Sequence, residues 1–158
     1  MSAMTPPEAP PLDVERWFNT GAPPTLAGLR GKVVVLHAFQ MLCPGCVSHA
    51  IPQAKRLHQI AEGVDDLVVL GLHSVFEHHA AMTPVSLEAF LHEYKIAFPV
   101  AVDRAAADGP IPRTMAAYGL RGTPSTIVID RAGLIARHSF GAEDDLVLGL
   151  VVGGLLKG

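Results

Sequence analysis

The feature that most constrains the fold is an eight-residue run at 32–39, KVVVLHAF, which is almost continuously apolar and rich in β-branched residues. Such a run is typical of a strand buried on both faces of a sheet. A helical pattern follows at 47–62, where apolar residues recur at helical spacing, and Gly63 comes directly after it. A buried strand that leads directly into a helix predicts a β–α unit with a parallel crossover, so we expect an α/β domain.

The alternation of strands and helices continues to the end of the chain. A second apolar run at 66–73 predicts another buried strand, and the next helix is expected to begin after Thr83, with Pro84 at its first position. The remaining predicted elements are a strand at 98–102, a short helix at 113–118, strands at 125–130 and 134–140, and a closing helix at 143–157. The last two strands are joined by three residues that end in Gly133, which suits a tight hairpin. We therefore expect a mixed sheet with helices on both faces.

The beginning of the chain differs from the rest in its proline content. Six of the 13 prolines lie within residues 1–24. Since proline restricts the backbone and removes a hydrogen-bond donor, we expect this segment to be extended, with at most a short strand or one helical turn around residues 14–18. Trp17 is expected to pack the segment against the rest of the molecule. Residues 25–158 are predicted to form a single domain.

Length, composition and charge exclude several classes of protein. The chain has 158 residues and a mass of 16.7 kDa, with 49% hydrophobic and 17% charged residues. These values are typical of one soluble globular domain with a substantial core. The formal net charge of −3 does not favour binding to a phosphate backbone, so nucleic acid is not expected as a partner.

Neither export nor membrane insertion is expected. The chain start lacks the basic, apolar and small-residue regions of a secretory signal, and the apolar stretch 146–156 is too short to span a bilayer. We therefore expect a cytoplasmic protein with no membrane partner. Gly149 and Gly153 have the spacing of small residues at helix interfaces, which we attribute to close packing of a helix on the sheet. A monomer is expected, with a weak dimer as the alternative.

The two cysteines of the chain lie three positions apart, as Cys43-Pro44-Gly45-Cys46, between the first predicted strand and its helix. Such a pair can close a disulfide when the first cysteine precedes the helix and the second lies on its first turn. The helix N-terminus would stabilise the thiolate of Cys43, which makes Cys43 the expected nucleophile. Cys46 is expected to be more buried and to act as the resolving thiol. Pro44 suits the first helical position, and Gly45 leaves the backbone open beside the sulfurs.

A CxxC pair has three other uses in proteins: zinc binding, haem attachment and plain packing in the core. A structural zinc site needs four ligands, and no second CxxC is present. The candidates to complete such a site are histidines, namely His37, His49, His73, His78 and His79. Haem attachment would need histidine at position 47, which is valine, and a Pro-Gly insert is unusual for two inert core cysteines. No metal or cofactor is therefore expected, and a metal clip or redox-sensing binding module remains an alternative.

Several segments together resemble the thioredoxin superfamily, most closely its TlpA-like and redoxin (AhpC/TSA-related) branch. The segments are GKVVVLHAFQMLCPGC, VVLGLHS, FPVAVD and YGLRGTPSTIVIDRAGLI, and the similarity extends from about Leu26 to the end of the chain. The resemblance implies a thioredoxin-like fold and dithiol–disulfide exchange, with a thiol-based antioxidant role. The implied partners are a disulfide-containing protein or small molecule and a dithiol reductant.

The resemblance also implies a second part of the site, at Thr123 and Pro124. In the family the corresponding proline follows a cis peptide bond and lies beside the CxxC motif. A proline at the start of a strand removes a backbone donor, and Thr123 is then expected to present its backbone to a bound polypeptide.

The chain departs from the family pattern close to the cysteines. Leu42 stands where the family has tryptophan, and Pro52 lies six residues beyond Cys46 rather than five. Peroxiredoxins share the fold, but Gln40 replaces the threonine that they carry three residues before their reactive cysteine. These departures leave substrate choice open, and peroxide reduction at Cys43 is the alternative activity.

Proton transfer to and from Cys46 needs a nearby acid or base, which in many relatives is a buried carboxylate. Glu77 is the one acid in the loop after the second predicted strand, so it is the candidate, with a solvated glutamate as the alternative. His49, three residues after Cys46, is expected at the helix surface, although it could tune the site. His37 is expected to be a core histidine with satisfied hydrogen bonds.

Overall fold

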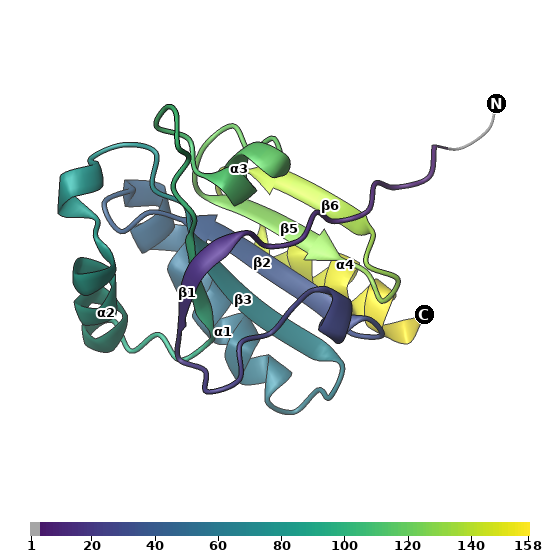
Figure 1. Cartoon of the computed structure of the whole chain (residues 1–158). Coiled ribbons are helices and arrows are strands. Elements are labelled where there is room, and N and C mark those ends of the chain that lie inside the picture. Colours follow the sequence, from purple (N-terminus) through teal and green to yellow (C-terminus); the bar gives the residue numbers. More distant parts are fainter. Residues whose placement is uncertain (1–3) are drawn as a thin grey trace.

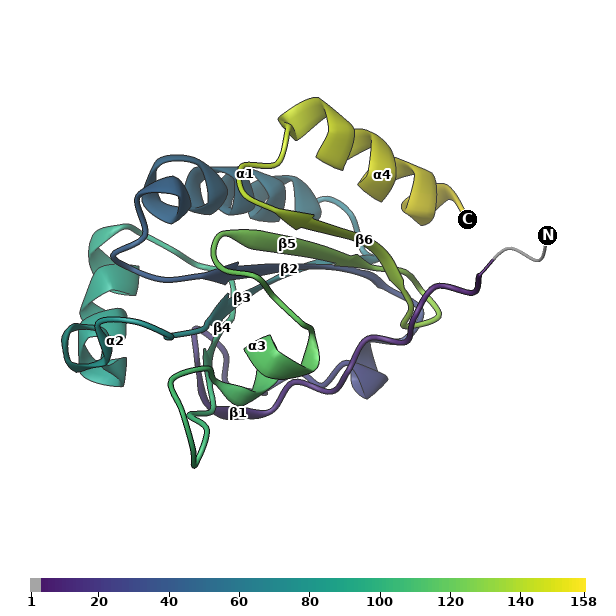
Figure 2. The ribbon, with the colours of Figure 1, turned by 90° about the horizontal axis from the view of Figure 1, so that it is seen from above.

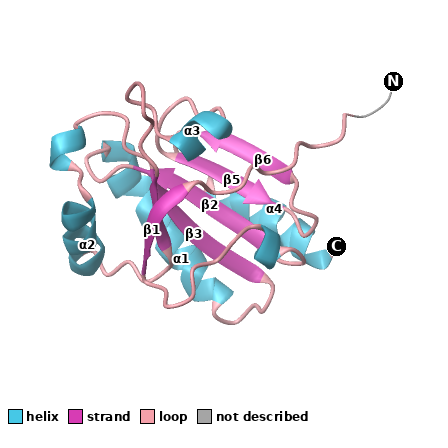
Figure 3. Ribbon diagram, in the orientation of Figure 1, coloured by secondary structure: helices cyan, strands magenta, loops and turns pink. Residues whose placement is uncertain are grey.

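Six strands form one sheet, in the order β1-β4-β3-β2-β5-β6, in the computed structural model of the chain, which describes residues 4–158 (Figures 1 and 3). The strands are β1 Val14–Phe18, β2 Val33–Phe39, β3 Leu67–His73, β4 Val100–Asp103, β5 Ser125–Ile129 and β6 Ile135–Phe140. β3 runs parallel to β2 and β4, while the pairs β1–β4, β2–β5 and β5–β6 are antiparallel. The prediction of a mixed sheet is confirmed.

Helices cover both faces of this sheet. They are the π-helix Cys46–Ala50, α1 Ile51–Ala61, α2 Pro84–Glu93, α3 Arg113–Ala117 and α4 Asp145–Lys157, with short 3₁₀ turns at Ala27–Leu29 and His79–Ala81. Figure 2 shows α1 and α4 on one face and α3 on the other. Among the helices of residues 4–158, none has both the length and the apolar character needed to cross a membrane.

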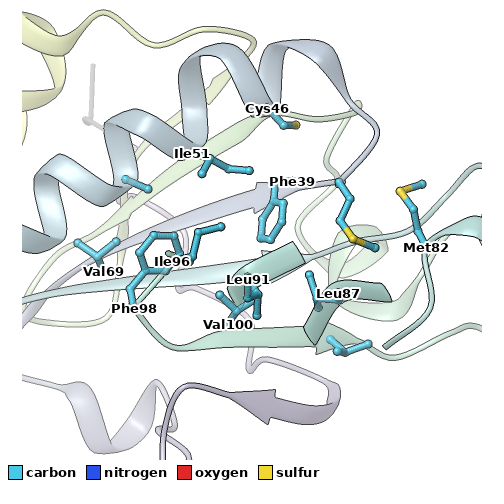
Figure 4. Packing of buried hydrophobic residues seen from close by; sticks show 13 residues of the cluster. Phe39, Cys46, Ile51, Val69, Met82, Leu87, Leu91, Ile96, Phe98 and Val100 are labelled. Carbon is cyan, nitrogen blue, oxygen red and sulfur yellow. The ribbon is translucent and has the colours of Figure 1, made fainter. Parts of the chain in front are cut away.

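The central strand β2 carries the core on both of its faces, since all seven of its residues are buried. Val33 and Val35 pack with residues of α4, while Leu36 belongs to the cluster on the opposite face. At the carboxyl end of the strand, Phe39 joins a third cluster with residues of α1, α2 and β3 and with Phe98, which lies just before β4 (Figure 4). The near-continuous apolar run of the sequence is therefore explained by burial on both sides.

The proline-rich beginning of the chain lies along the edge of the sheet. β1 forms there and pairs with β4, which agrees with the short strand expected around residues 14–18. Trp17 packs against the core cluster on the α3 face, and the Tyr118 hydroxyl donates a hydrogen bond of 2.7 Å to the carbonyl of Pro10. Residues 1–3 of the segment lie outside the described residues. Within this segment, β1 covers the edge of β4, which would otherwise be unpaired.

The helix predicted at 47–62 is divided into two parts. The π-helix Cys46–Ala50 precedes α1, and the amide of Ile51 bonds to the carbonyl of Cys46, five residues back. Pro52 explains the wide turn, because it has no amide hydrogen and its ring excludes the carbonyl four residues earlier from α-helical geometry. The regular helix therefore starts one turn later than the periodicity predicts.

Local turn and cap predictions are confirmed, with shifts at two boundaries. Thr83 caps α2 by accepting a hydrogen bond from the amide of Ser86, and Gly133 turns the β5–β6 hairpin with a φ of 84°. α4 begins at Asp145 rather than at residue 143, since the Asp144 side chain caps it by accepting two amide hydrogen bonds. The strand expected at 98–102 is found at β4, Val100–Asp103.

Candidate active site

The cysteine pair lies at the carboxyl end of β2, where the chain turns into the π-helix. The amide of Cys43 donates a hydrogen bond of 3.2 Å to the carbonyl of Gln40, which closes the turn after the strand. Pro44 and Gly45 are already helical, and Cys46 is the first residue of the π-helix. Cys43 therefore precedes the helix and Cys46 lies on its first turn, as the sequence predicts.

The two sulfur atoms have different surroundings. Cys43 is partly exposed, whereas Cys46 is completely buried, and both are free thiols in this structure. The Cys46 amide donates a hydrogen bond of 3.3 Å to Cys43 Sγ, and the Cys43 thiol donates one of 3.5 Å to the carbonyl of Thr123. Burial, reinforced by the hydrogen bond with Cys43, raises the pKa of the Cys46 thiol to about 12. At neutral pH Cys46 is thus held as a protonated thiol.

The loop before β5 completes the surroundings of Cys43. The Thr123–Pro124 peptide bond is cis, the geometry that the family resemblance implies. A Cβ atom built on Gly45 would lie 3.5 Å from Cδ of Pro124, so the backbone between the cysteines runs along the proline ring. Pro44 is exposed beside them. The structure therefore brings together the CxxC segment and the Thr-Pro segment.

Gln40 connects three parts of the site, and its role was not apparent from the sequence. Its side chain is buried, and Oε1 accepts hydrogen bonds from the amides of Phe76 at 3.1 Å and Glu77 at 3.4 Å. Nε2 donates to Glu77 Oε1 at 3.3 Å and to Thr123 Oγ1 at 3.5 Å. The sequence signal was a long polar side chain directly after a strand buried on both faces. Gln40 fixes the loop after β3 relative to Thr123.

Glu77, the sequence candidate for proton transfer, is exposed at this edge of the site. The side-chain hydrogen bond that ties its carboxylate to the site comes from Gln40, not from a cysteine. Glu77 is thus linked to Thr123 through Gln40, and its participation in proton transfer stays a prediction.

His37 lies in the core on β2, but the expectation of satisfied hydrogen bonds is wrong. Neither Nδ1 nor Nε2 has a hydrogen-bond partner within the described part of the chain. Its neighbours across the sheet are Gly71 on β3 and Thr126 on β5. Burial lowers the pKa of His37 to about 4, with a smaller contribution from His49, so its ring is neutral at pH 7. The neutral imidazole is therefore buried without a hydrogen bond from the described residues.

His49 is not the free surface histidine that the sequence favoured. Its Nε2 lies 2.6 Å from the carbonyl oxygen of Glu143, and Gln53 Nε2 donates a 2.8 Å hydrogen bond to the same oxygen. The Glu143 carboxylate is buried, accepts hydrogen bonds from Arg137 at 2.8 and 2.9 Å, and also bonds to the hydroxyl of Ser139. The Arg137 guanidinium holds the pKa of Glu143 below its usual value. This polar cluster ties the helix that carries the cysteines to the start of α4.

The structure gives no support to the metal-clip alternative. Across residues 4–158, no group of three or more His, Cys, Asp or Glu side chains is gathered as a metal site would require. His73 accepts a hydrogen bond of 3.3 Å from the amide of Met41, and His79 lies 3.1 Å from the carbonyl of Pro110. These histidines contact backbone groups instead of the cysteines.

Comparison with known proteins identifies the family. The model of the AhpC/TSA family matches residues 8–138, which is most of the chain. The chain belongs to the AhpC/TSA family. The thioredoxin-superfamily resemblance carried by the cysteine and Thr-Pro segments is therefore confirmed.

Solved structures show that this AhpC/TSA family member has a thioredoxin-like fold. The crystal structure of the thioredoxin-like superfamily protein SPOA0173 is 56% identical, with a TM-score of 0.91, over 96% of this chain and 97% of that one. The structure of a thiol-disulfide isomerase from Corynebacterium glutamicum is 51% identical, with a TM-score of 0.89, over 95% and 97% of the two chains.

More distant sequence relatives are longer proteins. The thiol-disulfide oxidoreductase ResA of Halalkalibacterium halodurans is 26% identical over 77% of this chain and 62% of its own length. The NHL repeat-containing protein 2 of Gallus gallus is 34% identical over 56% of this chain and 12% of its own length. The AhpC/TSA family chain thus spans less than two thirds of each of these relatives.

Proposed function

We propose that this AhpC/TSA family protein catalyses dithiol–disulfide exchange, with Cys43 as the nucleophile and Cys46 as the resolving thiol. The observation that carries the proposal is the asymmetry of the pair. Cys43 is accessible and receives an amide hydrogen bond at the start of the helix, while Cys46 is buried and held protonated behind it. The similarity to a thiol-disulfide isomerase and to a thiol-disulfide oxidoreductase also supports this activity.

The reaction proceeds in two exchanges. The Cys43 thiolate bonds to one sulfur of the substrate, the substrate disulfide breaks, and the other sulfur leaves as a thiolate that takes up a proton. Cys46 then gives up its proton, and its sulfur bonds to Cys43 Sγ and releases the second substrate thiol. The substrate gains two electrons and two protons, and the protein is left with a Cys43–Cys46 disulfide. A dithiol reductant restores the two thiols.

A disulfide-containing polypeptide is the substrate that the surroundings of Cys43 favour. Leu42, directly before the nucleophile, is 58% exposed and offers an apolar contact beside the reacting sulfur. On the other side, the carbonyl of Thr123, in the loop before β5, lies 3.5 Å from Cys43 Sγ, so a main-chain group lies next to the reacting sulfur. A small-molecule disulfide is the second substrate class. The cytoplasmic location stays a prediction from the sequence.

Redox titration tests this activity directly. The protein is equilibrated with glutathione buffers of defined ratio, and the thiols of Cys43 and Cys46 are counted by alkylation and mass spectrometry. We expect a single two-electron transition with an intramolecular disulfide, and a stable mixed disulfide when Cys46→Ser is given a substrate disulfide. If no Cys43–Cys46 disulfide forms at any ratio, the proposal is wrong. Rapid peroxide consumption with a sulfenic acid on Cys43 would indicate the peroxidase instead, and tight stoichiometric zinc binding would indicate the clip.

A further inference from the structure

The outward face of α4 is apolar. Leu146 and Leu150 are each 78% exposed, and with Gly153 and Lys157 they form one stripe along the helix, at spacings of four, three and four residues. The opposite side of the helix, represented by the buried Leu148, packs on the sheet. An uncovered apolar helix face next to a packed one is typical of an interaction surface.

The stripe has both protruding and hollow positions. Its protruding positions are the two exposed leucines. The hollow positions are Gly153 in the stripe and Gly149 directly beside it, one residue before Leu150; at both, an added Cβ would meet nothing within 4 Å in the described chain. Beside Gly149, a shallow groove of about 150 Å³ lies between α4 and α1 and includes Leu57 and Ile60. Figure 2 shows the two helices side by side on this face. Leucine side chains of a second helix could occupy these hollows.

We propose that α4 is the two-fold interface of a homodimer, in which the helices of two copies pack antiparallel. In one register of such a pair, Leu146 lies opposite Gly153 of the partner subunit, and Leu150 lies opposite the partner's Gly149. A two-fold axis repeats both contacts, so every exposed leucine of the stripe faces a glycine. Close approach of the helices at the glycines then buries all four leucines of the two copies.

The charges at the helix ends agree with the antiparallel orientation. α4 is preceded by Asp144 and ends with Lys157, and antiparallel packing brings the lysine of one copy within about half a turn of the partner's Asp144. The helix dipoles are then also opposed favourably. A parallel pair would instead place leucine against leucine and aspartate against aspartate. Self-complementarity of shape and charge thus favours a second copy of this chain as the occupant.

A lipid surface is a poorer partner for the same face. Amphipathic helices that lie on membranes carry lysines and arginines along their polar side, whereas α4 has Asp144 and Asp145 at its start and one lysine at its end. The face contains neither Cys43 nor Cys46, so the dimer does not depend on the proposed exchange activity. The interface of one 13-residue helix per copy is small, and we expect a dimer that dissociates on dilution.

Sedimentation velocity of the full-length protein tests the interface. We expect the mass to rise from that of the monomer towards that of the dimer between about 1 and 300 μM, the range in which a small interface dissociates. Leu146→Glu/Leu150→Glu should raise the dissociation constant by at least about tenfold, because charges would be buried. The matched control is Val85→Glu on α2, at a residue that is 79% exposed, and it should dimerise like the wild type. A wild type that stays monomeric at about 300 μM, or a dimer that survives the double substitution, overturns the proposal.

The register has its own test. In the Cys43→Ser/Cys46→Ser background, Leu150→Cys places one thiol per copy next to the two-fold axis, so mild oxidation should produce a covalent dimer. Val85→Cys is the control and should cross-link much less. Gly153→Leu should weaken association by at least about tenfold, since it fills the hollow opposite Leu146, while circular dichroism shows the helix retained. Cross-linking no greater than that of Val85→Cys, or binding of neutral lipid vesicles without dimerisation, would contradict the proposed pairing.

Discussion

At the scale of single residues, the two thiols of the motif differ more than their spacing indicates. Cys43 is partly exposed in the turn after β2, and the Cys46 amide donates a hydrogen bond to its sulfur, whereas Cys46 is completely buried. Desolvation disfavours a buried thiolate, so only the accessible sulfur is ready to react. In the proposed exchange, the assignment of Cys43 as nucleophile and Cys46 as resolving thiol therefore rests on their difference in burial and on the position of Cys43 at the start of the helix.

Selective alkylation checks this difference. Iodoacetamide at about pH 7.5 should add one carbamidomethyl group per folded chain, on Cys43, because the buried Cys46 stays protonated and inaccessible. In denaturant both cysteines should react. Peptide mapping by mass spectrometry locates the adduct, and Cys43→Ser serves as the control that should remain unmodified while folded. Equal labelling of both cysteines in the folded protein would contradict the assignment of roles.

His37 provides a second residue-scale prediction, on the pH dependence of stability. Its pKa is about 4 when folded and about 6.5 when unfolded, so the unfolded chain binds the proton first as the pH falls. The stability that depends on neutral His37 is therefore fully present above about pH 6.5 and is lost as the pH falls towards 4. At pH 5 this group alone lowers the free energy of unfolding by about 2 kcal/mol. His37→Leu should remove that part of the decrease in urea unfolding experiments. The part due to His73, whose pKa is also lowered to about 4 by burial, should remain.

The control for this prediction is a substitution on the same strand that removes no titratable group. Val35→Ala, at another buried position of β2, should lower the stability by a similar amount at every pH, since it removes no group that binds a proton. If the stability of His37→Leu decreases with falling pH as steeply as that of the wild type, His37 has a hydrogen-bond partner in solution and does not cause the decrease.

At the scale of elements, hydrophobic periodicity in the sequence is sufficient to predict most of the helices and strands. The buried strands β2 and β3 and the cap of α2 lie where apolar runs and Thr83 predicted them, because those signals are local. The wide turn at the π-helix was missed, since its cause, Pro52, sits inside an otherwise regular helical pattern. The role of Gln40 was missed for another reason: its partners come from loops distant in the sequence.

Gln40→Leu tests how much the elements around the site depend on this one side chain. Leucine cannot accept the amide hydrogen bonds of Phe76 and Glu77, so the loop after β3 should lose its anchor, at a cost of about 1–3 kcal/mol in the free energy of unfolding. Exchange with a protein disulfide should also slow. Urea denaturation and stopped-flow exchange measure the two effects.

The matched control at this site is Glu77→Gln, which keeps the loop backbone and the acceptor for Gln40 while it removes the charge. Glu77→Gln should have the same urea midpoint as the wild type. A loss of exchange activity in Glu77→Gln with stability unchanged would instead assign the proton-transfer role to Glu77, as the sequence suggested.

At the scale of the whole molecule, the strand β1 near the start of the chain completes the sheet. β1 covers the edge of β4, and the Asn19 side chain donates hydrogen bonds of 2.7 and 3.1 Å to the carbonyls of Ile96 and Phe98. Sequence alone predicted an extended segment with a short strand, but not its partner, because pairing over more than 80 residues leaves no local pattern. The segment thus contacts a part of the core that lies more than 75 residues away in the chain.

Deletion of residues 1–19 should therefore destabilise the whole molecule. The truncated chain loses the β1–β4 pairing, the packing of Trp17 on the core and both Asn19 hydrogen bonds, so we expect a loss of at least about 3 kcal/mol in the free energy of unfolding. The exposed edge of β4 should also promote aggregation, which light scattering detects. Deletion of residues 1–5 is the control and should leave the urea midpoint unchanged, since β1 stays intact. If the longer deletion also unfolds at the wild-type midpoint, the edge strand contributes nothing to stability, and β4 alone closes the sheet.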